Sequence, residues 1–121
     1  MSAAEMRALS ARAIAAWNER RFDDFYALYH PDVLHHSADG VDRHGVIELR
    51  TLYDSVLAVC PDLTITPISV VADPEAGLLA SIQTESGTTV GGDAFGFQGM
   101  LFLRLSDDGL VHEAWEQIRP L

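Results

Sequence analysis

The final apolar segment of the chain carries two carboxylates and an imidazole, an unusual content for a strand. A tight turn at Asp107-Asp108-Gly109 precedes a strand-like run over residues 110–118. Side chains alternate along a strand, so each face of this run carries one acid. The two faces hold Val111, Glu113, Trp115 and Gln117 on one side, and His112, Ala114, Glu116 and Ile118 on the other. A carboxylate that is desolvated against an indole has a raised pKa, which suits proton transfer near neutral pH.

These residues predict general acid–base catalysis. Glu113 is the first candidate because Val111 and Trp115 on its face favour burial, and Glu116 is the second. The alternative for Glu113 is a solvated strand position or an ion pair with a nearby arginine. Glu116 is instead a surface charge if its face is the outer or dimer-forming one.

Other groups offer less chemistry. Cys60 is the only cysteine, so we expect no intrachain disulfide, no cysteine metal cluster, and a buried thiol in a reducing compartment. No two candidate ligands lie at the helical spacing of metal sites, and His35 and His36 diverge on a strand, so no bound metal is expected. The glycine-rich segment 87–96 does not precede a helix, which argues against a phosphate-binding loop. A mobile rim at a cavity mouth is expected there.

The charge of the chain excludes several classes of partner. The formal net charge is -10, from 18 acidic against eight basic residues. Phosphates would be repelled, so we expect a neutral or apolar small molecule rather than nucleic acid or an anionic membrane. All eight basic residues are arginines, which excludes lysine Schiff-base chemistry. The N-terminus lacks a signal-peptide pattern and no run of about 18 apolar residues occurs, so a cytoplasmic protein is expected.

The elements that position these groups fit one domain over residues 1–121. Apolar residues at helical spacing predict three helices, at about 2–20, 23–29 and 45–59. Alternation and turn residues predict strands at 33–37, 63–72, 78–85, 97–105 and 110–118, the last four as two antiparallel hairpins. This order predicts an α+β fold in which a cone-shaped, curved antiparallel sheet wraps around three N-terminal helices and encloses a pocket.

The order of these pieces resembles the SnoaL-like polyketide cyclase and ester cyclase family of the nuclear-transport-factor-two-like superfamily, over nearly the whole chain. The resemblance rests on short motifs in order: Tyr29-His30-Pro31-Asp32 before a strand that ends in His36-Ser37, Gly45 at the start of the third helix, Pro61-Asp62-Leu63 before a strand, Gly99-Met100 before an apolar run that ends at Arg104, and Gly109 with Glu113 and Trp115. It implies a cone-shaped α+β fold and a homodimer, without metal or organic cofactor.

The resemblance also implies a reaction, in which a pocket acid or base drives an intramolecular aldol closure or a related enolisation of an apolar, cyclic substrate. In this family the histidine that matches His36 tends to line the pocket and acids on the final strand act as general acid or base. The expected catalytic residues are therefore Glu113, Glu116 and His36. The chain departs from many relatives at Arg119, where they have an aspartate four residues after the final-strand tryptophan. The expected substrate-binding residues are Trp17, Tyr53, Phe97, Leu101 and Trp115.

Other functions stay open, because this scaffold hosts unrelated chemistries. One is an isomerase of the ketosteroid type. Another is an enzyme of the limonene epoxide hydrolase type, in which Arg104 or Arg119 with an acid would orient water. Two carboxylates bridged by an arginine inside the cavity would favour the hydrolase. A third is a non-catalytic ligand-binding or dimerisation module, which would have a closed apolar cavity and would expose both Glu113 and Glu116.

Overall fold

The computed structural model describes all 121 residues and contains three helices and six strands. The helices are α1 (Ala3–Asn18), α2 (Phe22–Tyr26) and α3 (Val46–Val59). The strands are β1 (Tyr29–His36), β2 (Asp42–His44), β3 (Thr64–Asp73), β4 (Leu78–Thr88), β5 (Ala94–Leu105) and β6 (Val111–Pro120). The three helices and both hairpins are confirmed, and the short strand β2 is an addition that the sequence did not predict. None of the helices combines the length and the apolar character that crossing a membrane requires.

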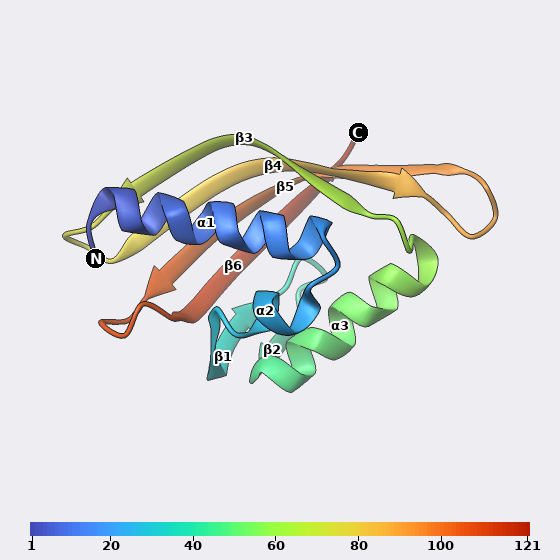
Figure 1. Cartoon of the computed structure of the whole chain (residues 1–121). Coiled ribbons are helices and arrows are strands. Elements are labelled where there is room, and N and C mark those ends of the chain that lie inside the picture. The colour runs from blue at the N-terminus through green and yellow to red at the C-terminus, as the bar shows by residue number, and fades with distance from the viewer.

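The strands form one curved, unclosed sheet in the order β2-β1-β6-β5-β4-β3 (Figure 1). All neighbouring strands are antiparallel except β1 and β6, which run parallel. The α+β prediction is therefore confirmed, with one parallel pair in the sheet. The parallel pairing brings the end of β1 beside the middle of β6, so that His35 and His36 face Ala114 and Trp115 across the ladder.

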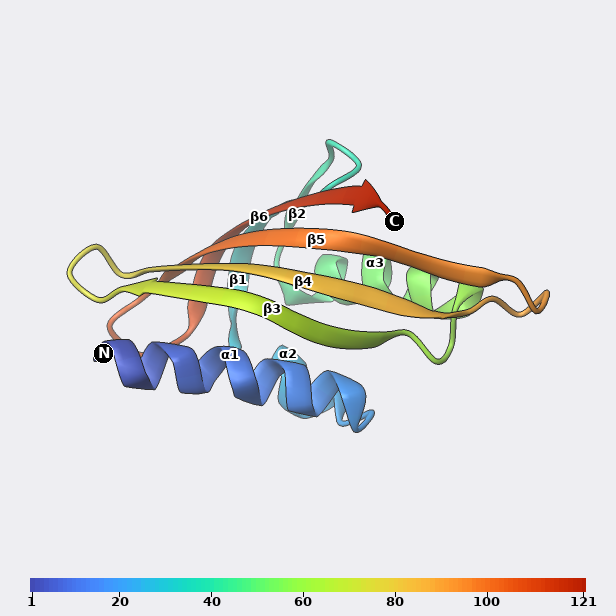
Figure 2. The ribbon, with the colours of Figure 1, turned by 90° about the horizontal axis from the view of Figure 1, so that it is seen from above.

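Helix α1 runs along the β3 edge of the sheet (Figure 2). Its first turn is closed by a capping box, in which Ser2 and Glu5 each accept a hydrogen bond from the other's backbone N–H. Its last turn is bound to the chain at and just before β3. The Trp17 indole N–H donates to the Leu63 carbonyl at 2.9 Å, and the Asn18 amide exchanges two hydrogen bonds with the backbone of Ile65. These bonds fix the buried face of α1 over the concave side of the sheet.

Helix α3 is less buried than its many apolar residues suggest. Leu49 is its only fully buried residue, and it packs into the core between the helices and the sheet. Leu52, Tyr53 and Val56 are only partly covered because they face an internal cavity rather than packed side chains. The apolar periodicity of residues 45–59 thus predicts the helix but does not distinguish a packed core from a cavity wall.

A β-bulge near the start of β6 decides which acid faces inward. Arg104 of β5 pairs with Glu113, whereas the next residue, Leu105, pairs with Val111, so His112 is an extra residue in the ladder. Val111 is buried in the core, but the bulge reverses the alternation beyond it. Glu113 therefore does not share a face with Val111, and the alternation drawn from the sequence was wrong at this point. Glu116 is on the concave side of the sheet.

Candidate active site

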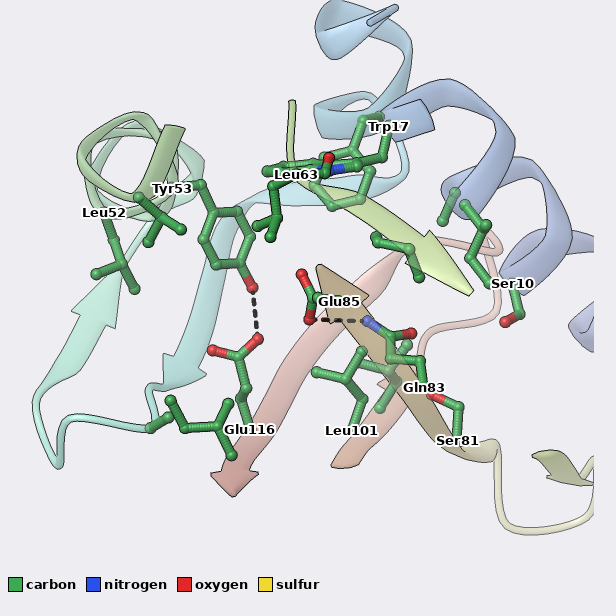
Figure 3. A pocket seen from close by; sticks show the side chains of 18 of the residues that line it. Ser10, Trp17, Leu52, Tyr53, Leu63, Ser81, Gln83, Glu85, Leu101 and Glu116 are labelled. Carbon is green, nitrogen blue, oxygen red and sulfur yellow. Dashed lines mark hydrogen bonds between the residues drawn. The ribbon is translucent and has the colours of Figure 1, made fainter. Parts of the chain in front are cut away.

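The concave side of the sheet and the helices enclose a cavity of about 290 Å³ (Figure 3). Nineteen of its 25 lining residues are hydrophobic, so a ligand inside would meet mainly aliphatic and aromatic groups. The lining contains neither arginine nor histidine. Against this apolar background, the few polar groups are expected to fix the orientation of a ligand.

Glu116 extends from β6 into the cavity, where the Tyr53 hydroxyl from α3 donates a hydrogen bond to Glu116 Oε2 at 3.1 Å (Figure 3). Burial, and next the nearby charge of Glu85, raise the pKa of Glu116 to about 7, and the hydrogen bond from Tyr53 opposes this rise. A carboxyl group with this pKa can both accept and return a proton near neutral pH.

Tyr53 is itself held by a chain of hydrogen bonds from β1. The Tyr53 oxygen lies 3.1 Å from His35 Nε2, and His35 Nδ1 lies 2.8 Å from Ser37 Oγ. Burial, and then the charge of Arg43, lower the pKa of His35 to about 4, so its ring is neutral at pH 7. Because Tyr53 gives its only proton to Glu116, it accepts from His35 Nε2–H, and Nδ1 accepts from Ser37. The histidine that reaches the cavity acid is therefore His35, through Tyr53.

A second buried acid lies on β4. Glu85 and Gln83 both line the cavity and are only 8% and 6% exposed. Gln83 Nε2 donates to Glu85 Oε2 at 3.2 Å, and burial raises the pKa of Glu85. The sequence pattern did not single out this acid. Alternation places Leu79, Ser81, Gln83 and Glu85 on one face of the strand, but only the fold shows that this face turns inward.

The residues predicted from the sequence divide between two sides of the sheet. Five of them line the cavity: Trp17, Tyr53, Phe97, Leu101 and Glu116. The other three, Glu113, His36 and Trp115, lie outside it. His36 Nε2 is 2.8 Å from Glu113 Oε2, and the His36 ring stacks on Trp115 with the ring centroids 5.0 Å apart. The expected placement of Glu113, His36 and Trp115 in the pocket is therefore corrected to the convex side, because the bulge turns Glu113 and Trp115 outward and His35 takes the inward position on β1.

The cluster of His36, Glu113 and Trp115 on the convex side of the sheet has a structural explanation. Hydrogen bonds that the His36 ring donates to Glu113, and then to Asp42, raise the pKa of His36 and hold its ring between β6 and β2. Trp115 and Phe102 line a separate groove on this side, with Met100 beside them. These contacts join β1, β2, β5 and β6 without approaching the cavity.

One group of potential metal ligands lies outside the cavity. Ligand atoms of His30, Asp108 and His112 lie within 4.8 Å of one another. The backbone N–H of Asp32 donates to His30 Nδ1 at 3.0 Å, which occupies one lone pair of that ring.

The glycine-rich segment forms the end of β4, a turn at residues 89–93 and the start of β5, and its Phe95 contacts the cavity.

An α+β fold in which the concave face of a curved, open sheet and the helices enclose an apolar cavity is typical of the nuclear-transport-factor-two-like superfamily. Residues 11–114 match the model of the SnoaL-like domain, and the chain belongs to this family. Among curated proteins, none matches the chain.

Solved structures agree with this fold. AclR from Streptomyces galilaeus, assigned as a hydroxylase, is 25% identical with a TM-score of 0.85 over 98% of this chain and 81% of its own. A protein of Xanthomonas campestris pv. campestris assigned as a polyketide cyclase is 17% identical, with a TM-score of 0.82 over 93% of this chain and 89% of its own. PrhC from Penicillium brasilianum is 20% identical, with a TM-score of 0.82 over 95% and 80%.

Proposed function

We propose that this protein is a cofactor-independent enzyme that moves a proton at an activated carbon of an uncharged, apolar, cyclic small molecule. The observation that carries the proposal is Glu116, a carboxyl group inside an apolar cavity with a pKa of about 7 and a tyrosine hydroxyl bonded to it. The family and the similar structures assigned as polyketide cyclase and hydroxylase support a small-molecule enzyme.

The reaction begins with the Glu116 carboxylate. Glu116 takes a proton from a carbon beside a carbonyl group, and the electron pair of that C–H bond forms an enolate. In a cyclase, the enolate carbon then attacks a second carbonyl of the same molecule, which forms a carbon–carbon bond, and Glu116 returns its proton to the new alkoxide. In an isomerase, Glu116 returns the proton to a different carbon. Tyr53 holds the carboxylate in place throughout, because its hydroxyl is fixed by His35.

The charge of the cavity restricts the substrate. Three carboxyl groups line it, those of Glu85, Glu116 and Asp39, and no lining side chain is basic. An anionic ligand would meet these groups in a poorly solvated space, where like charges repel strongly. An uncharged ring compound meets the nineteen hydrophobic residues without that cost.

The alternatives receive less support. An epoxide hydrolase with an arginine between two cavity carboxylates does not fit, because Arg104 lies on the convex side, 3.8 Å from Glu113, and Arg119 is exposed. A non-catalytic module with exposed acids does not fit Glu116, which is held inside the cavity by Tyr53. The homodimer stays a prediction, supported by the half-exposed Met100 and Phe102 on the convex face.

The test uses 2-tetralone, an uncharged bicyclic ketone with activated C1 protons. In D2O at about pH 7, the protein is expected to exchange these protons for deuterium at least about tenfold faster than buffer alone, since positioned general bases accelerate such steps by about 10²–10⁴-fold. Loss of the C1 proton signal in NMR spectra measures the rate. Exchange at the buffer rate would contradict the proposal.

A further inference from the structure

Strand β4 presents a row of polar side chains to the cavity. Ser81, Gln83 and Glu85 occupy alternate positions and all three line it. Of these three side chains, Glu85 is the most costly to bury, because a carboxyl group that leaves water loses solvation free energy unless it is paired. Its side chain has one hydrogen-bond partner, Gln83 Nε2, which contacts only Oε2. Glu85 Oε1 has no partner within the protein, and Figure 3 shows the carboxyl group directed into the cavity.

The neighbouring strand leaves space for this carboxyl group. Gly99 of β5 pairs with Gln83, and a Cβ atom at Gly99 would lie 3.3 Å from Glu85 Oε2 and 3.6 Å from Gln83 Cγ. The backbone at Gly99 does not have a positive φ, so glycine is not needed there for its conformation. The absence of a side chain instead allows Glu85 and Gln83 to lie flat against β5.

Glu85 and Glu116 share one cavity, so their protonation states are linked. Two carboxylates in a poorly solvated space repel each other, and the pair therefore keeps one proton over a range of pH. Either carboxyl group can carry this shared proton, so Glu85 holds it whenever Glu116 is ionised. The other ionisable groups around them are Tyr29 and His35 from β1, Tyr53 from α3, and Asp39 with its ion-pair partner Arg43 from the β1–β2 segment. Both tyrosines and His35 are neutral at pH 7, so they add hydrogen bonds rather than charge.

We propose that Glu85 is a second catalytic residue, which acts in its protonated form as hydrogen-bond donor to the substrate carbonyl oxygen while Glu116 removes the proton from the adjacent carbon. This inference rests on the proposed function. The C–H bond breaks toward Glu116, its electron pair forms the carbon–carbon double bond, and the carbonyl oxygen takes up negative charge that the Glu85 O–H stabilises. The proton count of the cavity and substrate together does not change, and no oxidant or metal is needed.

The inference predicts a specific pH profile for the exchange of 2-tetralone. Glu116 alone would give a rate that rises with pH to a plateau. The pair gives a bell-shaped profile, because the rate falls again when the remaining proton is lost. In Glu85→Gln, an amide N–H replaces the acid as a donor that does not titrate. We expect the falling limb to disappear, the rising limb to stay at about the same pH because Glu116 ionises beside a neutral group in both proteins, and the maximum rate to stay within about tenfold of the wild type.

Two further variants test the role of Glu85 even if Glu85→Gln does not fold. Glu85→Leu removes the donor and is expected to lower the exchange rate by about 10²–10³-fold. Gly99→Ala displaces the Glu85 carboxyl group by a few tenths of an ångström and is expected to lower kcat more than it raises KM. Glu75→Gln, in the exposed β3–β4 turn, is the matched control and should keep the wild-type profile. Melting curves establish that each variant is folded.

The outcomes separate the two proposals. A plateau at high pH in the wild type, or a bell-shaped profile that Glu85→Gln leaves unchanged, would overturn the role of Glu85 and leave Glu116 as the base. A Glu116→Gln variant that keeps the wild-type exchange rate would overturn the proposed function itself.

Discussion

Glu116→Gln is expected to slow the deuterium exchange of 2-tetralone by about 10²–10⁴-fold, the usual contribution of a positioned general base. The amide has the shape of the carboxylate and its oxygen still accepts the hydrogen bond from Tyr53, so the cavity keeps its form. It cannot accept a proton from carbon. The loss should therefore appear in kcat, with KM nearly unchanged.

Glu113→Gln provides the matched control on the same strand. Glu113 lies three residues before Glu116 and outside the cavity, where its partners are His36 and Arg104. Its substitution should leave the exchange rate within about twofold of the wild type, because Glu113 does not line the cavity in which the proton is transferred. Equal losses in the two variants would contradict the assignment of Glu116 as the base.

The second large effect is on stability. The pKa of Glu116 is raised from 4.5 to about 7 in the folded protein, so the folded state binds this proton more tightly than the unfolded state. The contribution of protonated Glu116 to the free energy of unfolding is fully present below pH 4.5. It is lost as pH rises to about 7, by about 3 kcal/mol in all. Glu116→Gln removes this dependence.

Urea unfolding of the wild type and of Glu116→Gln at about pH 4 and about pH 8 measures the effect. The difference in unfolding free energy between the two proteins should shift in favour of the variant by about 3 kcal/mol from the lower to the higher pH. Other groups titrate equally in both proteins and largely cancel in this difference. A difference that does not change with pH would show that Glu116 is not buried as described.

The helices and strands could be predicted because the spacing of apolar residues along the chain follows which side chains are buried. Trp17 and Met6 lie on the apolar stripe of α1, and both are buried against the sheet. The two hairpins follow from alternation and from the turns at Asp73-Pro74-Glu75-Ala76-Gly77 and Asp107-Asp108-Gly109. These signals need no knowledge of the tertiary structure.

The site could be predicted only in part, because it violates the same patterns. The bulge at His112 shifts every later side chain of β6 to the other face, and nothing in the local sequence marks it. His35 and His36 are adjacent and only the fold decides which one turns inward. Gln83 and Glu85 look like solvent-facing strand residues, yet they are buried because the inward face of β4 borders a cavity. Functional sites are where local rules and the fold disagree.

Glu116 is a cavity carboxyl group that gains and loses a proton near neutral pH. An NMR titration of the protein with 13C-labelled glutamate side-chain carboxyls measures this directly, with the Glu116 signal identified by its absence in Glu116→Gln. A midpoint near pH 7 is expected. A midpoint near 4.5, the ordinary value for glutamate, would contradict the role of Glu116 as a general base near neutral pH.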